Sequence, residues 1–88
     1  MPYGVEFRPE ALDNLRSLDK AIAQRIFRRL KWLSENLDNV TPEALTADLK
    51  GLLKLKIGGH RVIYEIKRGE HLLTIHFVGH RRDVYKRK

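Results

Sequence analysis

The positions of hydrophobic residues predict two helices in the first half of the chain. Pro9 suits the first position of a helix, and leucines follow it at three-residue spacing. Asp19 is a typical N-cap residue for a second, longer helix. Five residues of that helix recur every three or four positions and form one apolar face, which Phe27 is expected to widen. They are Ile22, Ile26, Leu30, Leu33 and Leu37.

The remaining hydrophobic residues alternate with polar ones, which is typical of strands. A short strand is predicted at residues 3–7, and three more at 53–57, 61–66 and 72–78, where Gly79 ends the last one. Gly58-Gly59 and Gly69-Glu70 are two-residue hairpin signals between these last three strands. Thr41-Pro42 is typical of a helix start, so a further helical turn is expected over residues 43–49.

The two short turns predict how the last three strands pair, because loop length sets the register of a hairpin. Lys56 then lies opposite Arg61, and Arg61 lies opposite Val78. One face of the sheet becomes wholly apolar or aromatic and must pack on the helices. Its members are Leu53, Leu55, Ile57, Val62, Tyr64, Ile66, Leu73, Ile75 and Phe77.

Basic residues are concentrated in the second part of the chain. The 88 residues include 18 Lys and Arg and 11 Asp and Glu, for a net charge of +7. Residues 1–49 are nearly neutral, whereas the three predicted C-terminal strands and the tail carry the excess and all four histidines. The predicted register gathers Lys54, Lys56 and Arg61 on the face away from the helices, with His80 and Arg81 just beyond. Such a cluster favours binding of a polyanion, and the plainer alternative is an ordinary solvent-facing sheet surface.

Composition excludes several classes of function. The length is that of one domain, so residues 1–88 are expected to form a single unit. Without cysteine there is no disulfide and no cysteine-ligated zinc site. No apolar run reaches the roughly 20 residues of a membrane helix, and the histidines lack the spacing of a metal site, so neither membrane nor metal is expected. Carboxylate pairs suited to hydrolysis and phosphate-binding glycine loops are also missing.

Cleavage of RNA is a reaction that a cluster of cations can support without metal. The 2′-hydroxyl of RNA is itself the nucleophile, so the protein supplies only a base, an acid for the leaving 5′-oxygen and cations for the phosphate. Arginine binds phosphate through two parallel hydrogen bonds, and lysine or histidine can transfer protons. Tyr85 could stack on an unpaired base or transfer a proton.

Two segments of the chain resemble the RelE branch of the RelE/ParE toxin superfamily. They are LKLKIGGHRVIYEI at residues 53–66 and IHFVGHRRDVY at residues 75–85, and the opening FRPEAL at residues 7–12 is similar too. The resemblance covers essentially the whole chain. It implies an α+β fold, with a small antiparallel sheet of about four strands and two N-terminal helices packed on one face, in the order β-α-α-β-β-β.

The resemblance also implies a function. It implies a cytoplasmic toxin of a type II toxin–antitoxin system, an endoribonuclease that cleaves mRNA in the ribosomal A site without a cofactor and inhibits translation. The implied partners are a cognate antitoxin protein, the mRNA and ribosomal RNA. Residue by residue, the catalytic set becomes Lys54, Lys56, Arg61, His80, Arg81 and Tyr85.

In this set, Arg61 and Arg81 are expected to bind the phosphate, while a lysine and Tyr85 transfer protons and His80 is an alternative acid. RNA binding is further expected of the tail residues Arg82, Lys86 and Arg87. Two alternatives remain open. One is a ParE-like toxin that inhibits DNA gyrase without cleaving RNA, although that branch generally lacks this Lys/Lys/Arg/Arg/Tyr set. The other is a catalytically silent domain that binds RNA or an antitoxin.

Overall fold

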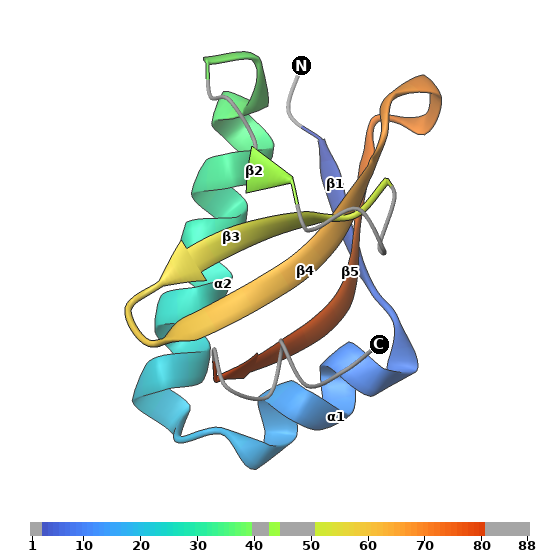
Figure 1. Cartoon of the computed structure of the whole chain (residues 1–88). Coiled ribbons are helices and arrows are strands. Elements are labelled where there is room, and N and C mark those ends of the chain that lie inside the picture. Colours follow the sequence, from blue (N-terminus) through green and yellow to red (C-terminus); the bar gives the residue numbers. More distant parts are fainter. Residues whose placement is uncertain (1–2, 40–42, 45–50, 81–88) are drawn as a thin grey trace.

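Two helices lie against one face of a five-stranded sheet in the computed structural model, which describes residues 3–39, 43–44 and 51–80 (Figure 1). The helices are α1 (Pro9–Ser17) and α2 (Lys20–Asn36), and a 3₁₀ turn, η1 (Leu37–Asn39), follows. The strands are β1 (Gly4–Phe7), β2 (Glu43–Ala44), β3 (Leu53–Ile57), β4 (His60–Lys67) and β5 (Leu72–His80). Their spatial order is β1-β5-β4-β3-β2, so β1 and β2 form the two edges.

The predicted fold class is confirmed, with both helices on one face, and the short strand β2 is an addition to the predicted order of elements. The sheet is mixed rather than wholly antiparallel, because β1 runs parallel to β5, with Gly4 opposite Leu72 and Phe7 opposite Ile75. No tight turn joins these two strands, so their relative direction is set by tertiary packing and not by a local signal.

The helical turn predicted from residue 43 is also wrong at its start. Glu43 and Ala44 form β2, which pairs antiparallel with β3 through Lys54 and Leu53. A single helical turn is unfavourable on its own, whereas the edge of β3 offers backbone hydrogen-bond partners to any extended segment beside it. Residues 45–49 lie outside the described part of the chain.

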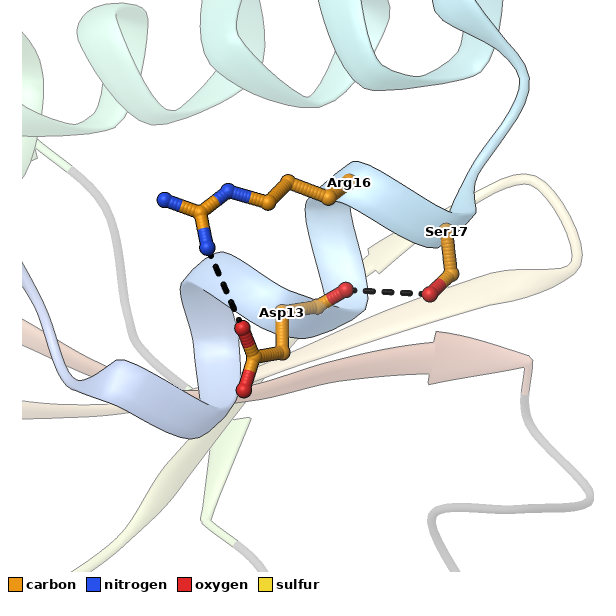
Figure 2. Close-up of polar contacts among 3 residues, drawn as sticks. All are labelled: Asp13, Arg16 and Ser17. Carbon is orange, nitrogen blue, oxygen red and sulfur yellow. Dashed lines mark hydrogen bonds and ion pairs between the residues drawn. The ribbon is translucent and has the colours of Figure 1, made fainter.

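The start of α2 follows the capping rules. The Asp19 carboxylate accepts a hydrogen bond of 3.1 Å from the Ala21 N–H, which confirms the predicted N-cap of α2. Figure 2 shows the last turn of α1, where the Ser17 hydroxyl donates to the Asp13 carbonyl at 3.0 Å. Arg16 pairs with the Asp13 carboxylate at 3.3 Å, and because both side chains are exposed this pair adds little stability.

The hydrophobic core fills the space between the helices and the sheet. Eight of the nine predicted sheet residues belong to it or pack against its margin. Phe27 does not widen the helix face as predicted, because it is 47% exposed and meets Phe7 edge-on at 5.5 Å. The ninth sheet residue, Phe77, is replaced in the core by Val78. The buried members are Ala11, Leu15, Ile26, Leu30, Leu33, Leu37, Ile57, Val62, Tyr64, Leu73, Ile75 and Val78.

An extra residue in β5 explains this replacement. Residues 63 and 64 of β4 are consecutive, but their partners Phe77 and Ile75 are not, so His76 stands in a β-bulge. One inserted residue reverses the face on which the following side chains lie. Phe77 therefore leaves the core and Val78, which is 1% exposed, enters it.

Asn14 of α1 supports β5 beyond the bulge. Its side-chain oxygen accepts a hydrogen bond of 3.0 Å from the Val78 N–H. On that side of β5 the neighbouring strand β1 has already ended at Phe7, so the asparagine takes the place of a strand partner. The strand then continues to His80, opposite His60, and the predicted break at Gly79 is wrong.

The second predicted turn has a different form but the same effect. Residues 68–70 form a short 3₁₀ turn, η3 (Arg68–Glu70), and His71 closes it in the left-handed region at φ 51°. Ile66 still pairs with Leu73, as the predicted register requires. The register survives because the longer loop is centred on the same residues.

Candidate functional site

The β3–β4 hairpin carries three cationic residues on its face away from the helices, which we term the outer cluster: Lys54, Lys56 and Arg61. Lys56 lies directly opposite Arg61, as predicted, and Lys54 shares its face because the two lysines are two residues apart. The tight Gly58-Gly59 turn holds this register, and Gly58 has φ +61°, a conformation that other residues rarely adopt.

Arg61 is the most buried member of the outer cluster, at 9% exposed. One terminal nitrogen, Nη1, donates to the carbonyls of Gly58 and His60, each at 2.9 Å, which fixes the guanidinium against the turn. Its Nε is buried without a hydrogen-bond partner. Across the described ranges no carboxylate pairs with this guanidinium, and a buried cation without a counter-ion favours binding of an anion.

Two acidic residues lie on the strands that carry or flank the outer cluster. Glu65 lies farther along β4, and its Oε1 is 3.2 Å from His76 Nε2. At the other side, the β2–β3 register sets Glu43 opposite Lys54. Sequence reasoning missed this pairing because a two-residue strand has no periodicity to detect.

His80 does not join the outer cluster. Beyond the bulge it pairs with His60, and both lie on the helix-facing side of the sheet, as does Ile57 on β3. The two imidazole rings are 5.7 Å apart and meet edge to face. The prediction that His80 lies beside the strand lysines is therefore wrong, because the bulge reverses the face of the residues that follow it.

Arg25 of α2 completes a second group of basic side chains, which we term the inner cluster: Arg25, His60 and His80. A Cβ built on Gly58 would lie 3.6 Å from Arg25 Nη1, and one built on Gly59 would lie 3.3 Å from His80 Nε2. Burial lowers the pKa of His60, and the nearby His80 and Arg25 lower it further. His60 is half-buried, whereas the other two are exposed.

Five predicted functional residues lie outside the described part of the chain, so their roles stay predictions. They are Arg81, Arg82, Tyr85, Lys86 and Arg87. Within residues 3–39, 43–44 and 51–80, no three His, Asp or Glu side chains gather as a metal site would require. In the same residues, no helix has both the length and the apolar character to span a membrane.

Comparison with known proteins places this geometry in a family. The family described as "ParE toxin of type II toxin-antitoxin system, parDE" matches residues 5–85. The chain belongs to the RelE/ParE toxin superfamily. A RelE-like toxin protein of Escherichia coli is 34% identical to this toxin over 92 residues, which cover 97% of this chain and 92% of the relative. The predicted superfamily is thus confirmed, and the protein is a toxin of the type II toxin–antitoxin class.

Solved structures confirm the toxin's fold. The RelBE2 toxin–antitoxin complex of Mycobacterium tuberculosis has a chain that matches with a TM-score of 0.82 and 27% identity, covering 92% of this chain and 93% of that one. The isolated RelE toxin of E. coli matches with a TM-score of 0.75 and 22% identity, covering 96% and 92%. The second likeness concerns the fold alone.

Proposed function

We propose that this toxin is a ribosome-dependent endoribonuclease that cleaves mRNA in the ribosomal A site and so inhibits translation. The observation that carries the proposal is the outer cluster, in which Lys56 lies opposite Arg61 and Lys54 shares their face. Like charges directly opposite one another on a sheet are unfavourable, and binding of a polyanion relieves their repulsion. A phosphodiester backbone is the polyanion that fits a translation-inhibiting toxin.

The proposed reaction uses the RNA's own nucleophile. The 2′-oxygen attacks the adjacent phosphorus while a base takes its proton, and the bond from phosphorus to the 5′-oxygen breaks. An acid gives a proton to that leaving oxygen, which leaves a 2′,3′-cyclic phosphate and a 5′-hydroxyl. Negative charge grows on the phosphoryl oxygens in the transition state, so donors fixed in advance lower the barrier.

The outer cluster can supply these parts. The Arg61 guanidinium is held in place by two carbonyls, so it is a pre-oriented donor for the phosphoryl oxygens. Lys54 or Lys56 is proposed to transfer a proton. Arg81 on the phosphate and Tyr85 in proton transfer complete the proposal by family resemblance. His80 takes no part in it, because it lies on the opposite face of the sheet.

The proposed partners follow from the same reasoning. Three solved relatives are toxin–antitoxin complexes, from M. tuberculosis, E. coli and Pyrococcus horikoshii, which supports a cognate antitoxin protein for this toxin. Binding of mRNA and ribosomal RNA is proposed for the tail residues Arg82, Lys86 and Arg87. The proposal needs neither metal nor cofactor, since the RNA 2′-oxygen and protein side chains supply every group.

A second candidate function is inhibition of DNA gyrase. It is favoured by the family description, which names the ParE toxin. Against it stands the resemblance to the RelE branch, since the ParE branch generally lacks the set formed by Lys54, Lys56, Arg61, Arg81 and Tyr85.

Induced expression followed by primer extension on a translated message separates the two functions. An endoribonuclease gives breaks in phase with codons, and Lys54→Ala should reduce them well over tenfold. Loss of a transition-state donor costs about 2.7–4 kcal/mol in the oxyanion-hole case. Lys31→Ala on α2 is the control, since it removes one exposed charge from a helix that packs on the other face of the sheet. Intact message together with a DNA-damage response would establish gyrase inhibition instead.

Cleavage of ribosome-bound mRNA by the purified toxin tests the individual residues. Arg61→Lys keeps the charge but loses the two-nitrogen fork, so it should cleave slowly while remaining folded. Turnover unchanged in both Lys54→Ala and Lys56→Ala would remove the two lysines from the reaction.

A further inference from the structure

The inner cluster brings three nitrogen donors to one end of the β3–β4 hairpin. They come from three elements: Arg25 from α2, His60 from β4 and His80 from β5. Figure 1 shows the β3–β4 turn beside the first half of α2, in keeping with the 3.6 Å between Arg25 Nη1 and a Cβ built on Gly58. All three side chains reach solvent, so the cluster is open to a ligand.

The inner cluster carries positive charge through Arg25. The charged groups that act on His60 are His80 and Arg25, and both lower its pKa. From β3 the residue opposite His60 is the apolar Ile57. No carboxylate of the described residues is among the groups that act on His60, and the Arg25 guanidinium lies at the same turn, so these two residues favour an anion with several acceptor oxygens.

The turn between the two clusters has no side chains. Gly58 and Gly59 are both exposed, and a Cβ at Gly59 would press on the His80 ring at 3.3 Å. Glycine thus lets the imidazole lie close against the turn. It also leaves only backbone at the turn between the outer cluster on one face and the inner cluster on the other.

We infer that the inner cluster binds a phosphate of an RNA backbone, so that one strand crosses the glycine turn from the outer cluster to the inner one. A phosphodiester offers only acceptor oxygens, which match the arginine fork and two imidazole N–H groups. Consecutive phosphates along one strand suit two separate cationic clusters on either side of a turn. The choice of RNA as the source of the phosphate rests on the proposed function.

The experiment measures binding without cleavage. The purified toxin is titrated with a short single-stranded RNA that is 2′-O-methylated throughout, which removes the nucleophile. Arg25→Gln and His60→Gln should each weaken binding about threefold to tenfold, and Arg25→Gln should lower the salt slope by about one. Lys31→Gln is the matched charge loss farther along α2, and it should leave the RNA affinity and the salt slope nearly unchanged.

Nuclear magnetic resonance gives the second readout. Titration of the His60 ring signals should show a higher pKa in the presence of this RNA, because a bound phosphate stabilises the protonated ring. Binding should accordingly strengthen as the pH falls through the histidine range. Circular dichroism checks that each variant is folded.

The outcomes are distinct. Equal weakening by Lys31→Gln, or a His60 titration that RNA leaves unchanged, would overturn the inference. The His60 pKa could instead rise with inorganic phosphate or with an acidic peptide while RNA has no effect. That result would assign the cluster to a different ligand and would also overturn the inference. The RNA probe cannot be cleaved, so this binding test does not depend on nuclease activity. If the toxin proved not to be a nuclease, weaker RNA binding by the Arg25 and His60 variants would still support the inference.

Discussion

The two sides of the β3–β4 hairpin hold cations of different kinds. On the outer side the charges are permanent, and the Arg61 guanidinium is 9% exposed and hydrogen-bonded to the turn. On the inner side two of the three groups are imidazoles, and burial together with the nearby His80 and Arg25 lowers the pKa of one of them, His60. His60 and Arg61 are neighbours in the chain, yet the pleat of the strand sends them to opposite faces. One hairpin can therefore present a charge that is fixed on one face and adjustable on the other.

The largest difference in stability is expected between Ile57 and Lys56, which are neighbours in β3. Ile57 is 5% exposed within the core, so Ile57→Ala should lower the free energy of unfolding by about 2–5 kcal/mol. Lys56 is exposed on the outer face, so Lys56→Ala should change it by less than about 1 kcal/mol. Urea unfolding of both variants measures the difference, and similar losses would mean that the two faces are not distinguished by burial.

The arginines of the two clusters should also differ. Arg61→Ala leaves the Gly58 and His60 carbonyls without their donor, and we expect a loss of roughly 1.5 kcal/mol together with faster hydrogen exchange at the turn. Arg25→Ala removes an exposed side chain and should change stability by no more than about 0.5 kcal/mol. A more stable Arg61→Ala protein would show that relief of a buried charge outweighs these hydrogen bonds.

The role of Asn14 in holding the end of β5, beyond the bulge, can be tested by mutation. Asn14→Ala removes the acceptor for the Val78 N–H, with an expected loss of about 1 kcal/mol and faster exchange of that amide. Asn36→Ala is the control, since the Asn36 side chain donates to the carbonyl of Trp32 within its own helix, at an exposed site. Unchanged exchange at Val78 would mean that the end of β5 does not depend on Asn14.

The smallest expected effect is a pH dependence that only the inner side shows. The pKa of His60 is lowered in the folded protein from its usual 6.5, so the unfolded chain binds more protons between the two values. The contribution of His60 to stability is therefore complete above about pH 6.5 and is lost as the pH falls through the folded-state pKa. Chemical unfolding at a series of pH values should show this decline, and His60→Gln should flatten it. Arg25→Gln should weaken it, and an equally steep decline in His60→Gln would exclude His60 as its source.

Much of this arrangement could be predicted from local patterns. The spacing of apolar residues gave both helices, and the Gly58-Gly59 signal gave the register that sets Lys56 opposite Arg61. The sequence contains no comparable signal for the bulge. Phe77 and Val78 are both hydrophobic, so the alternation in β5 is compatible with either residue in the core, and only packing against α1 selects Val78. Because His80 comes after the bulge, its predicted face was wrong for the same reason.

The extra residue at position 76 has a consequence for how such a protein can diverge. Removal of three nucleotides at His76 would make Phe77 follow Ile75 directly, so that the ladder becomes regular while Val78 stays opposite Val62 and His80 stays opposite His60. A gene can thus shorten this strand by one residue at the bulge without moving a single charge from one surface of the domain to the other.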